Sequence, residues 1–127
     1  MIIIPVSVGE LVDKLTILSI KMQFITNPEK LQHVSFEQSQ LQNAAKNFGV
    51  DEHPDYSDFF QELYECNLKI WMLEERIREL QREKRIDLEF AEVTNQTHLG
   101  NDQRMRIKYQ INQAYNSAIV EEKSYKE

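Results

Sequence analysis

The fold is decided first by the stretch Ser7-Val8-Gly9-Glu10-Leu11-Val12-Asp13-Lys14-Leu15-Thr16-Ile17-Leu18-Ser19-Ile20-Lys21-Met22. At about 100° per residue, a helix here has two apolar stripes. They consist of Leu11, Leu15, Leu18, Met22 and Ile25, and of Ile17, Ile20 and Phe24. A charged line lies between the stripes, made of Glu10, Lys14 and Lys21 with Asp13 alongside. Because apolar surface flanks this line on both sides, we expect its charges to be paired inside a bundle or exposed at the floor of a cleft.

The composition is that of an ordinary globular chain and predicts one domain over residues 1–127. Hydrophobic residues make up 41% and charged residues 28% of the 127 residues, and the net charge is −6. Nucleic-acid binding draws most of its affinity from basic residues facing phosphates, so we expect no nucleic-acid partner. The main basic cluster, 76–85, alternates with glutamates and is typical of the salt-bridged outer face of a long helix.

The N-terminus and the single cysteine indicate where the protein resides. Cys66 has no second cysteine to pair with, and no segment resembles a secretion signal, so we expect a cytoplasmic protein. The apolar run Met1-Ile2-Ile3-Ile4 stops at Pro5, far too short to cross a bilayer, and we expect no membrane partner. β-Branched residues ahead of a proline favour extended backbone, so residues 1–6 are predicted to form an extended arm pinned to the core.

Capping residues, prolines and glycines predict where helices start and end in the rest of the chain. Ser7 and Glu10 form a capping box that starts a helix over 7–26, and Asn27-Pro28 starts a second helix over 28–48, which Gly49 ends. A third helix over 55–85 carries an unbroken series of apolar residues at alternating steps of three and four. The series consists of Tyr56, Phe59, Leu63, Cys66, Ile70, Leu73, Ile77 and Leu80.

The C-terminal part is predicted to contain two further helices and a tail. A short helix over 87–97 is followed by a break at Gly100-Asn101, a last helix over 102–118 and a tail over 119–127. No segment alternates with period two long enough to indicate a strand. The sequence therefore predicts an all-α antiparallel helical bundle with one long heptad-patterned helix and a short extended N-terminal arm. Because the heptad seam extends beyond what the shorter helices cover, we expect a homodimer built along it.

Polar residues also gather near the start of the last predicted helix. Arg104, Lys108 and Asn112 rise at fourfold spacing along one face. If this face meets the charged line of the first helix, acids and bases share one composite site. Two interpretations stay open for it, an internal salt-bridge network and a site for a small anionic ligand. The candidate ligand-binding residues are Glu10, Asp13, Lys14, Lys21, Asn101, Asp102, Arg104 and Lys108.

An alternative site rests on the acidic pairs Glu62-x-x-Glu65 and Glu89-x-x-Glu92. Such pairs on adjacent helices hold Mg²⁺ through oxygen ligands, and their spacing is similar to that of the all-α nucleoside triphosphate pyrophosphohydrolases. That resemblance implies Mg-dependent hydrolysis of nucleotides, although Gln61 and Glu92 depart from the family's pattern. No ligand-spaced histidine pair and no Gly-rich phosphate loop is present, so the main interpretation includes neither a cofactor nor a metal nor a nameable catalytic activity.

Three segments carry a second resemblance. They are the stretch from Pro5 to Leu18, Asn101-Asp102-Gln103-Arg104-Met105-Arg106-Ile107-Lys108 with Ile111-Asn112, and Val120-Glu121-Glu122-Lys123-Ser124-Tyr125. With them the chain resembles a family of short bacterial and phage-borne proteins known only as a domain of unknown function. The resemblance implies no activity, but its polar residues coincide with those of the composite site, and it implies that the tail docks on the bundle. We therefore expect a helical binding or interaction protein, whose partner is a protein or a small anionic ligand.

Overall fold

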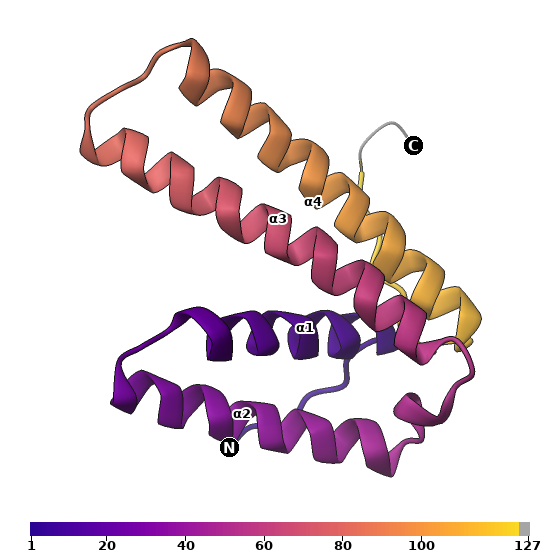
Figure 1. The fold of residues 1–127 in the computed structure, drawn as a ribbon. Coiled ribbons are helices and arrows are strands. Elements are labelled where there is room, and N and C mark those ends of the chain that lie inside the picture. Colours follow the sequence, from indigo (N-terminus) through magenta and orange to yellow (C-terminus); the bar gives the residue numbers. More distant parts are fainter. Residues whose placement is uncertain (125–127) are drawn as a thin grey trace.

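The computed structural model describes residues 1–124 and consists of two helical hairpins packed against each other (Figure 1). The first hairpin is α1 (Val8–Phe24) with α2 (Pro28–Asn47), and the second is α3 (Tyr56–Arg82) with α4 (Leu88–Ala114). A 3₁₀ turn, η1 (Val50–Glu52), lies in the connection between the hairpins. No strand occurs within residues 1–124. The predicted all-α helical bundle is confirmed; the last three residues of the predicted tail, Tyr125 included, lie outside the described part.

Side-chain caps start three of the helices, and two of these caps, Ser7 and Asn27, were predicted. The Ser7 side chain accepts a hydrogen bond from the Glu10 amide at 3.0 Å, and Asn27 and Asp87 cap α2 and α4 in the same way. The first three helices begin within one residue of their predicted starts and end one to three residues early, although α3 has no side-chain cap. The reciprocal half of the predicted capping box is absent from the hydrogen bonds of residues 1–124. The Glu10 carboxylate instead accepts from Lys108 on α4.

The predicted break at Gly100-Asn101 is wrong, because α4 runs through it as one helix. Gly100 lies where α3 and α4 pack closely, and a Cβ built on it would lie 3.0 Å from a side-chain carbon of Ile70. This glycine therefore serves helix packing and does not end a helix. The helix ends at Ala114, before the predicted boundary at 118, and Asn116 adopts a positive φ of 52° just beyond it.

The apolar residues of α3 face the core of their own chain. Leu63, Cys66, Ile70 and Leu80 are buried, and α1 and α4 both pack against α3. Val12 and Leu15 of α1 belong to the same core as Leu63 and Ile70. This part of the seam is therefore covered by α1 and α4 of the same chain.

The N-terminal arm does not pack on the core. Residues 1–7 have no regular secondary structure, but Met1–Ile4 are 67–90% exposed, so the prediction that the arm is pinned to the core is wrong. The core consists of residues of α1–α4 and of Val50 in η1, and includes none of the arm residues. Among the described residues, no helix has the length and apolar character needed to cross a membrane.

Gly9 allows a close contact between the backbones of α1 and α4. Its amide donates to Asn112 Oδ1 at 2.7 Å, and a Cβ added to Gly9 would lie 2.6 Å from the Lys108 carbonyl oxygen. Because the obstructing atom belongs to the backbone of α4, only movement of a whole helix relieves the clash.

We predict that Gly9→Ala destabilises the fold by about 1–3 kcal/mol, the usual cost of overpacking, as measured by urea unfolding. Gly100→Ala is the matched control, because its new Cβ meets only the side chain of Ile70 and alanine favours a helix interior by about 1 kcal/mol. An equal loss of stability in the two variants would contradict this account of Gly9.

Candidate ligand-binding site

Asp13 forms the centre of the site, with its side chain fully buried where three helices meet. Arg104 of α4 donates from Nε to Oδ1 at 2.8 Å and from a terminal nitrogen to Oδ2 at 2.5 Å. Asn67 of α3 donates to Oδ1 at 2.9 Å and also to Thr16 of α1. Two parallel bonds from a guanidinium are the strongest pairing available to a carboxylate, and they raise the pKa of Arg104. The buried charge of Asp13 is thus compensated by direct partners.

Lys108 forms a second connection between α1 and α4. Its side chain is only 8% exposed, and its Nζ lies 2.6 Å from Glu10 Oε2 and 3.9 Å from Asp13 Oδ2. Lys14 extends the same group of charges toward solvent, 4.0 Å from Glu10. The charged line of the first helix therefore meets the polar face of the last helix, which is the condition that the composite site requires.

The described part of the tail docks on the same region, which bears out the docking that the resemblance implied. Ser7 donates to Glu121 at 2.8 Å, and Asn112 donates from its Nδ2 to Glu121 at 3.3 Å. The Oδ1 of Asn112 accepts from Gly9, so this amide joins α1, α4 and the tail. Ser117 adds a further link by accepting from the Val8 amide at 3.2 Å.

Three of the predicted site residues lie outside this network. Lys21 lies near the end of α1, where the helix faces α3, as shown by the Phe24–Trp71 ring stack. It forms none of the ion pairs found in residues 1–124. Asn101 and Asp102 are half-buried on α4, and no hydrogen bond within the described chain connects them to Glu10 or Asp13.

Sequence reasoning missed Asn67 as a site residue. The signal was present, because Asn67 stands four residues after Leu63 and three before Ile70, and therefore lies on the buried face of α3. A polar residue at such a position is expected to have a buried hydrogen-bond partner, which here is Asp13.

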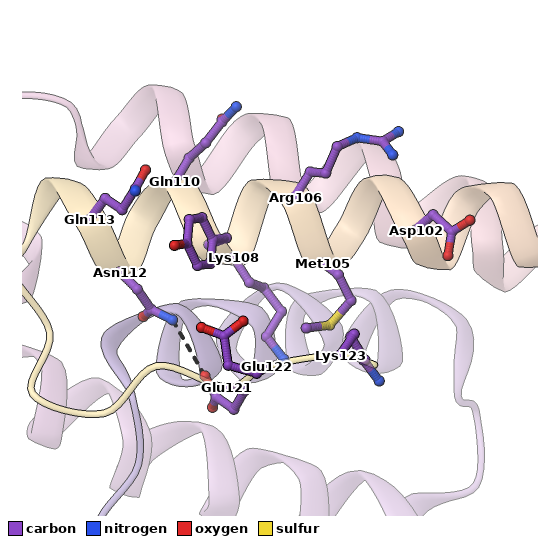
Figure 2. A pocket seen from close by; sticks show the side chains of 11 residues that line it. Asp102, Met105, Arg106, Lys108, Gln110, Asn112, Gln113, Glu121, Glu122 and Lys123 are labelled. Atoms are coloured by element: carbon purple, nitrogen blue, oxygen red, sulfur yellow. Dashed lines mark hydrogen bonds between the residues drawn. The ribbon is translucent and has the colours of Figure 1, made fainter. Parts of the chain in front are cut away.

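A pocket of about 580 Å³ opens beside the network, between α4 and the tail. Figure 2 shows Lys108 and Asn112 extending from α4 toward the tail, whereas Arg106 and Gln110 lie along the opposite edge of the helix. The remaining lining residues are Asp102, Met105, Tyr109, Gln113, Glu121, Glu122 and Lys123. Lysine, carboxylate and amide groups thus lie between α4 and the tail, with the Arg106 guanidinium at the far edge of the pocket, a combination suited to a small polar ligand.

The alternative magnesium site is wrong in this fold. The pairing of Arg76 with Glu89 at 2.8 Å shows that the end of α3 lies beside the start of α4, so Glu62 and Glu65 lie near the opposite end of the hairpin from Glu89 and Glu92. Hydrogen bonds from Arg76, and more weakly from Arg85, lower the pKa of Glu89. No group of three or more potential metal-ligating side chains of His, Cys, Asp or Glu occurs in the described residues.

Glu121 makes tail docking dependent on pH. Burial alone would raise its pKa, but the hydrogen bond from Ser7, the nearby charge of Lys108 and the bond from Asn112 outweigh burial and lower the pKa below 4.5. A pKa that is lower in the folded state gives stability that is present above the unfolded value and is lost as the pH falls through the folded value.

We therefore predict that the difference in unfolding free energy between wild type and Glu121→Gln shrinks as the pH falls from about 5 through the folded pKa of Glu121, because the unfolded pKa is near 4.5. Urea unfolding across this range measures the difference, and Glu122→Gln is the control for a neighbouring carboxylate. A wild-type advantage that stays constant down to low pH would contradict the proposed role of Glu121.

The comparisons with known proteins identify the family. Residues 2–127 match the model of a family of unknown function, DUF6165, so the match extends through the middle of the chain as well as its ends. No curated protein and no solved structure matches this chain. The chain therefore belongs to the family of unknown function DUF6165.

Proposed function

We propose that this protein is a binding protein whose pocket between α4 and the tail takes a small anionic ligand. The observation that carries the proposal is that the pocket between α4 and the tail shares three residues with the network that joins these elements to α1. Lys108, Asn112 and Glu121 line the pocket, and all three also belong to the network that holds α1, α4 and the tail together. The side chains that hold α1, α4 and the tail together are therefore the side chains that a ligand in the pocket would contact.

The cations of the pocket support an anionic ligand. Lys108 is held by Glu10, and a pre-positioned ammonium loses little further conformational freedom when a ligand binds. Arg106 is exposed at the pocket edge, and no ion pair within residues 1–124 occupies its guanidinium. A guanidinium in this position offers two parallel donors to a carboxylate, sulfate or phosphate group.

The other residues that line the pocket indicate which chemical groups the ligand carries besides its negative charge. Asp102 and Glu122 are acceptors, which favour hydroxyl or amino groups on the same ligand and disfavour a highly charged anion. Tyr109 lines the pocket and is partly exposed, so its ring offers apolar surface to the body of the ligand. These features support an anion of low charge that also carries hydrogen-bond donors.

Thermal unfolding in the presence of hydroxylated monocarboxylates, hydroxylated dicarboxylates, inorganic phosphate and sulfate tests this proposal. A ligand at a hundredfold its dissociation constant stabilises the folded protein by about 2.7 kcal/mol, which is readily detected for a domain of this size. For an anion that stabilises the wild type, Arg106→Ala is expected to weaken binding about tenfold, because one charge-assisted contact is lost.

Lys30→Ala is the matched control, since Lys30 is an exposed cation on α2 outside the pocket and is expected to leave binding unchanged. Stabilisation by none of the anions, or equal affinity in Arg106→Ala and wild type, would contradict the proposal. A protein partner would then be the binding function to test.

A further inference from the structure

The α3–α4 hairpin extends beyond the helices that cover it. At about 1.5 Å per residue, the 17 residues of α1 span about 25 Å and the 27 residues of α3 about 40 Å. Figure 1 shows the two hairpins diverging toward the end that holds the α3–α4 connection. Leu80 in this stretch of α3 is buried, but Leu73 and Ile77 are only half-buried, whereas Leu63 near the start of the helix is fully buried. The far half of α3 therefore has incomplete cover within residues 1–124.

A groove of about 320 Å³ lies between α1 and α3 where this cover ends. Ile17 and Ile20 of α1 line one side, and Ile70 and Trp71 of α3 line the other. Phe24 stacks on Trp71 with ring centroids 5.9 Å apart and is still 40% exposed. Tryptophan is among the residues most enriched at the energetic centres of protein interfaces, so a partly exposed pair of this kind favours an interaction surface.

Charged residues without partners continue the line of Trp71 along α3. Trp71, Glu75, Arg78 and Arg82 follow one another at steps of four, three and four, which places them on one face of the helix. We call these four residues the Trp71 stripe. None of the ion pairs in the described chain includes Glu75, Arg78 or Arg82.

Two arginines that lie outside the Trp71 stripe, Arg76 and Arg85, do form ion pairs. Arg76 pairs with Glu79 and Glu89, and Arg85 pairs with residues in the α3–α4 connection and at the start of α4. The prediction of a salt-bridged outer face is therefore confirmed for the charges next to α4 and is wrong for the Trp71 stripe. The unpaired charges of this region are concentrated beside the partly exposed tryptophan.

The order of residues in the Trp71 stripe is complementary to itself. When two copies of α3 pack antiparallel about a twofold axis between residues 76 and 77, Trp71 of one copy lies opposite Arg82 of the other, and Glu75 lies opposite Arg78. Each contact then occurs twice, giving two cation–π pairs and two carboxylate–guanidinium pairs. A parallel arrangement places like charges opposite each other. We infer that the protein forms an antiparallel homodimer through the Trp71 stripe and the adjoining groove.

Sedimentation equilibrium of the full chain tests this inference. The wild type is expected to have twice the monomer mass of 15.1 kDa at concentrations on the order of 100 μM. Arg78→Glu places four carboxylates at the twofold axis and is expected to raise the dissociation constant at least about tenfold. The double variant Glu75→Arg with Arg78→Glu exchanges both partners of each pair and is expected to restore the wild-type dissociation constant.

Lys30→Glu is the control, because it makes the same change of charge at an exposed position of α2, and it is expected to leave the dimer intact. Both α3 positions are exposed, so far-UV circular dichroism is expected to show unchanged helix content in all variants. A monomeric wild type overturns the inference. So does a dimer that Arg78→Glu leaves unaffected, or a double variant as weak as the single one.

Discussion

The structure depends on one carboxylate that has no contact with solvent. Removing the charge of Asp13 from water is costly, and the cost is offset only if Arg104 and Asn67 hold their hydrogen-bonding positions. These two partners come from α4 and α3, so satisfying Asp13 fixes where both helices lie against α1. Buried ion pairs add little net stability compared with apolar residues of the same size, and their main effect is to disfavour other arrangements of the helices.

The same constraint joins the two ends of the chain. Once α4 lies against α1, Gly9 permits contact with the α4 backbone, and Asn112 reaches both the Gly9 amide and Glu121 of the tail. The pocket is bounded by these elements, since α4 forms one side and the tail the other. Its shape therefore depends on an interaction between residues about ninety positions apart in the sequence, and a loss of the Asp13–Arg104 pair is expected to affect the pocket before it affects individual helices.

Features with a local cause were predictable from the sequence. Ser7, Asn27 and Asp87 cap the helices through bonds to residues three positions later, and the apolar period of α3 identified its buried face. The contact between α1 and α4 was one of two outcomes that the sequence left open, because a charged line between two apolar stripes is either paired inside a bundle or exposed at the floor of a cleft. Its polar partners on the last helix stood out by their fourfold spacing.

Features that depend on distant neighbours were not predictable. Gly100 resembles a helix break in sequence, but it lies within α4 at a point where Ile70 of α3 approaches it closely. Glu10 resembles the second half of a capping box, but Lys108 provides a stronger partner for its carboxylate. The four glutamates of the proposed magnesium site satisfied a spacing rule, yet the antiparallel hairpin separates the two pairs. In each case the deciding atom belongs to another helix, and no local pattern contains its position.

The most direct test of the central claim is a double-mutant cycle between Asp13 and Arg104. Unfolding free energies are measured by urea for wild type, Asp13→Asn, Arg104→Gln and the double variant. If the pair determines how α1 packs on α4, the two substitutions are strongly coupled, and the double variant is more stable than their sum by about 1–3 kcal/mol. Additive effects of the two substitutions would show that the helices are positioned without this ion pair and would contradict the account.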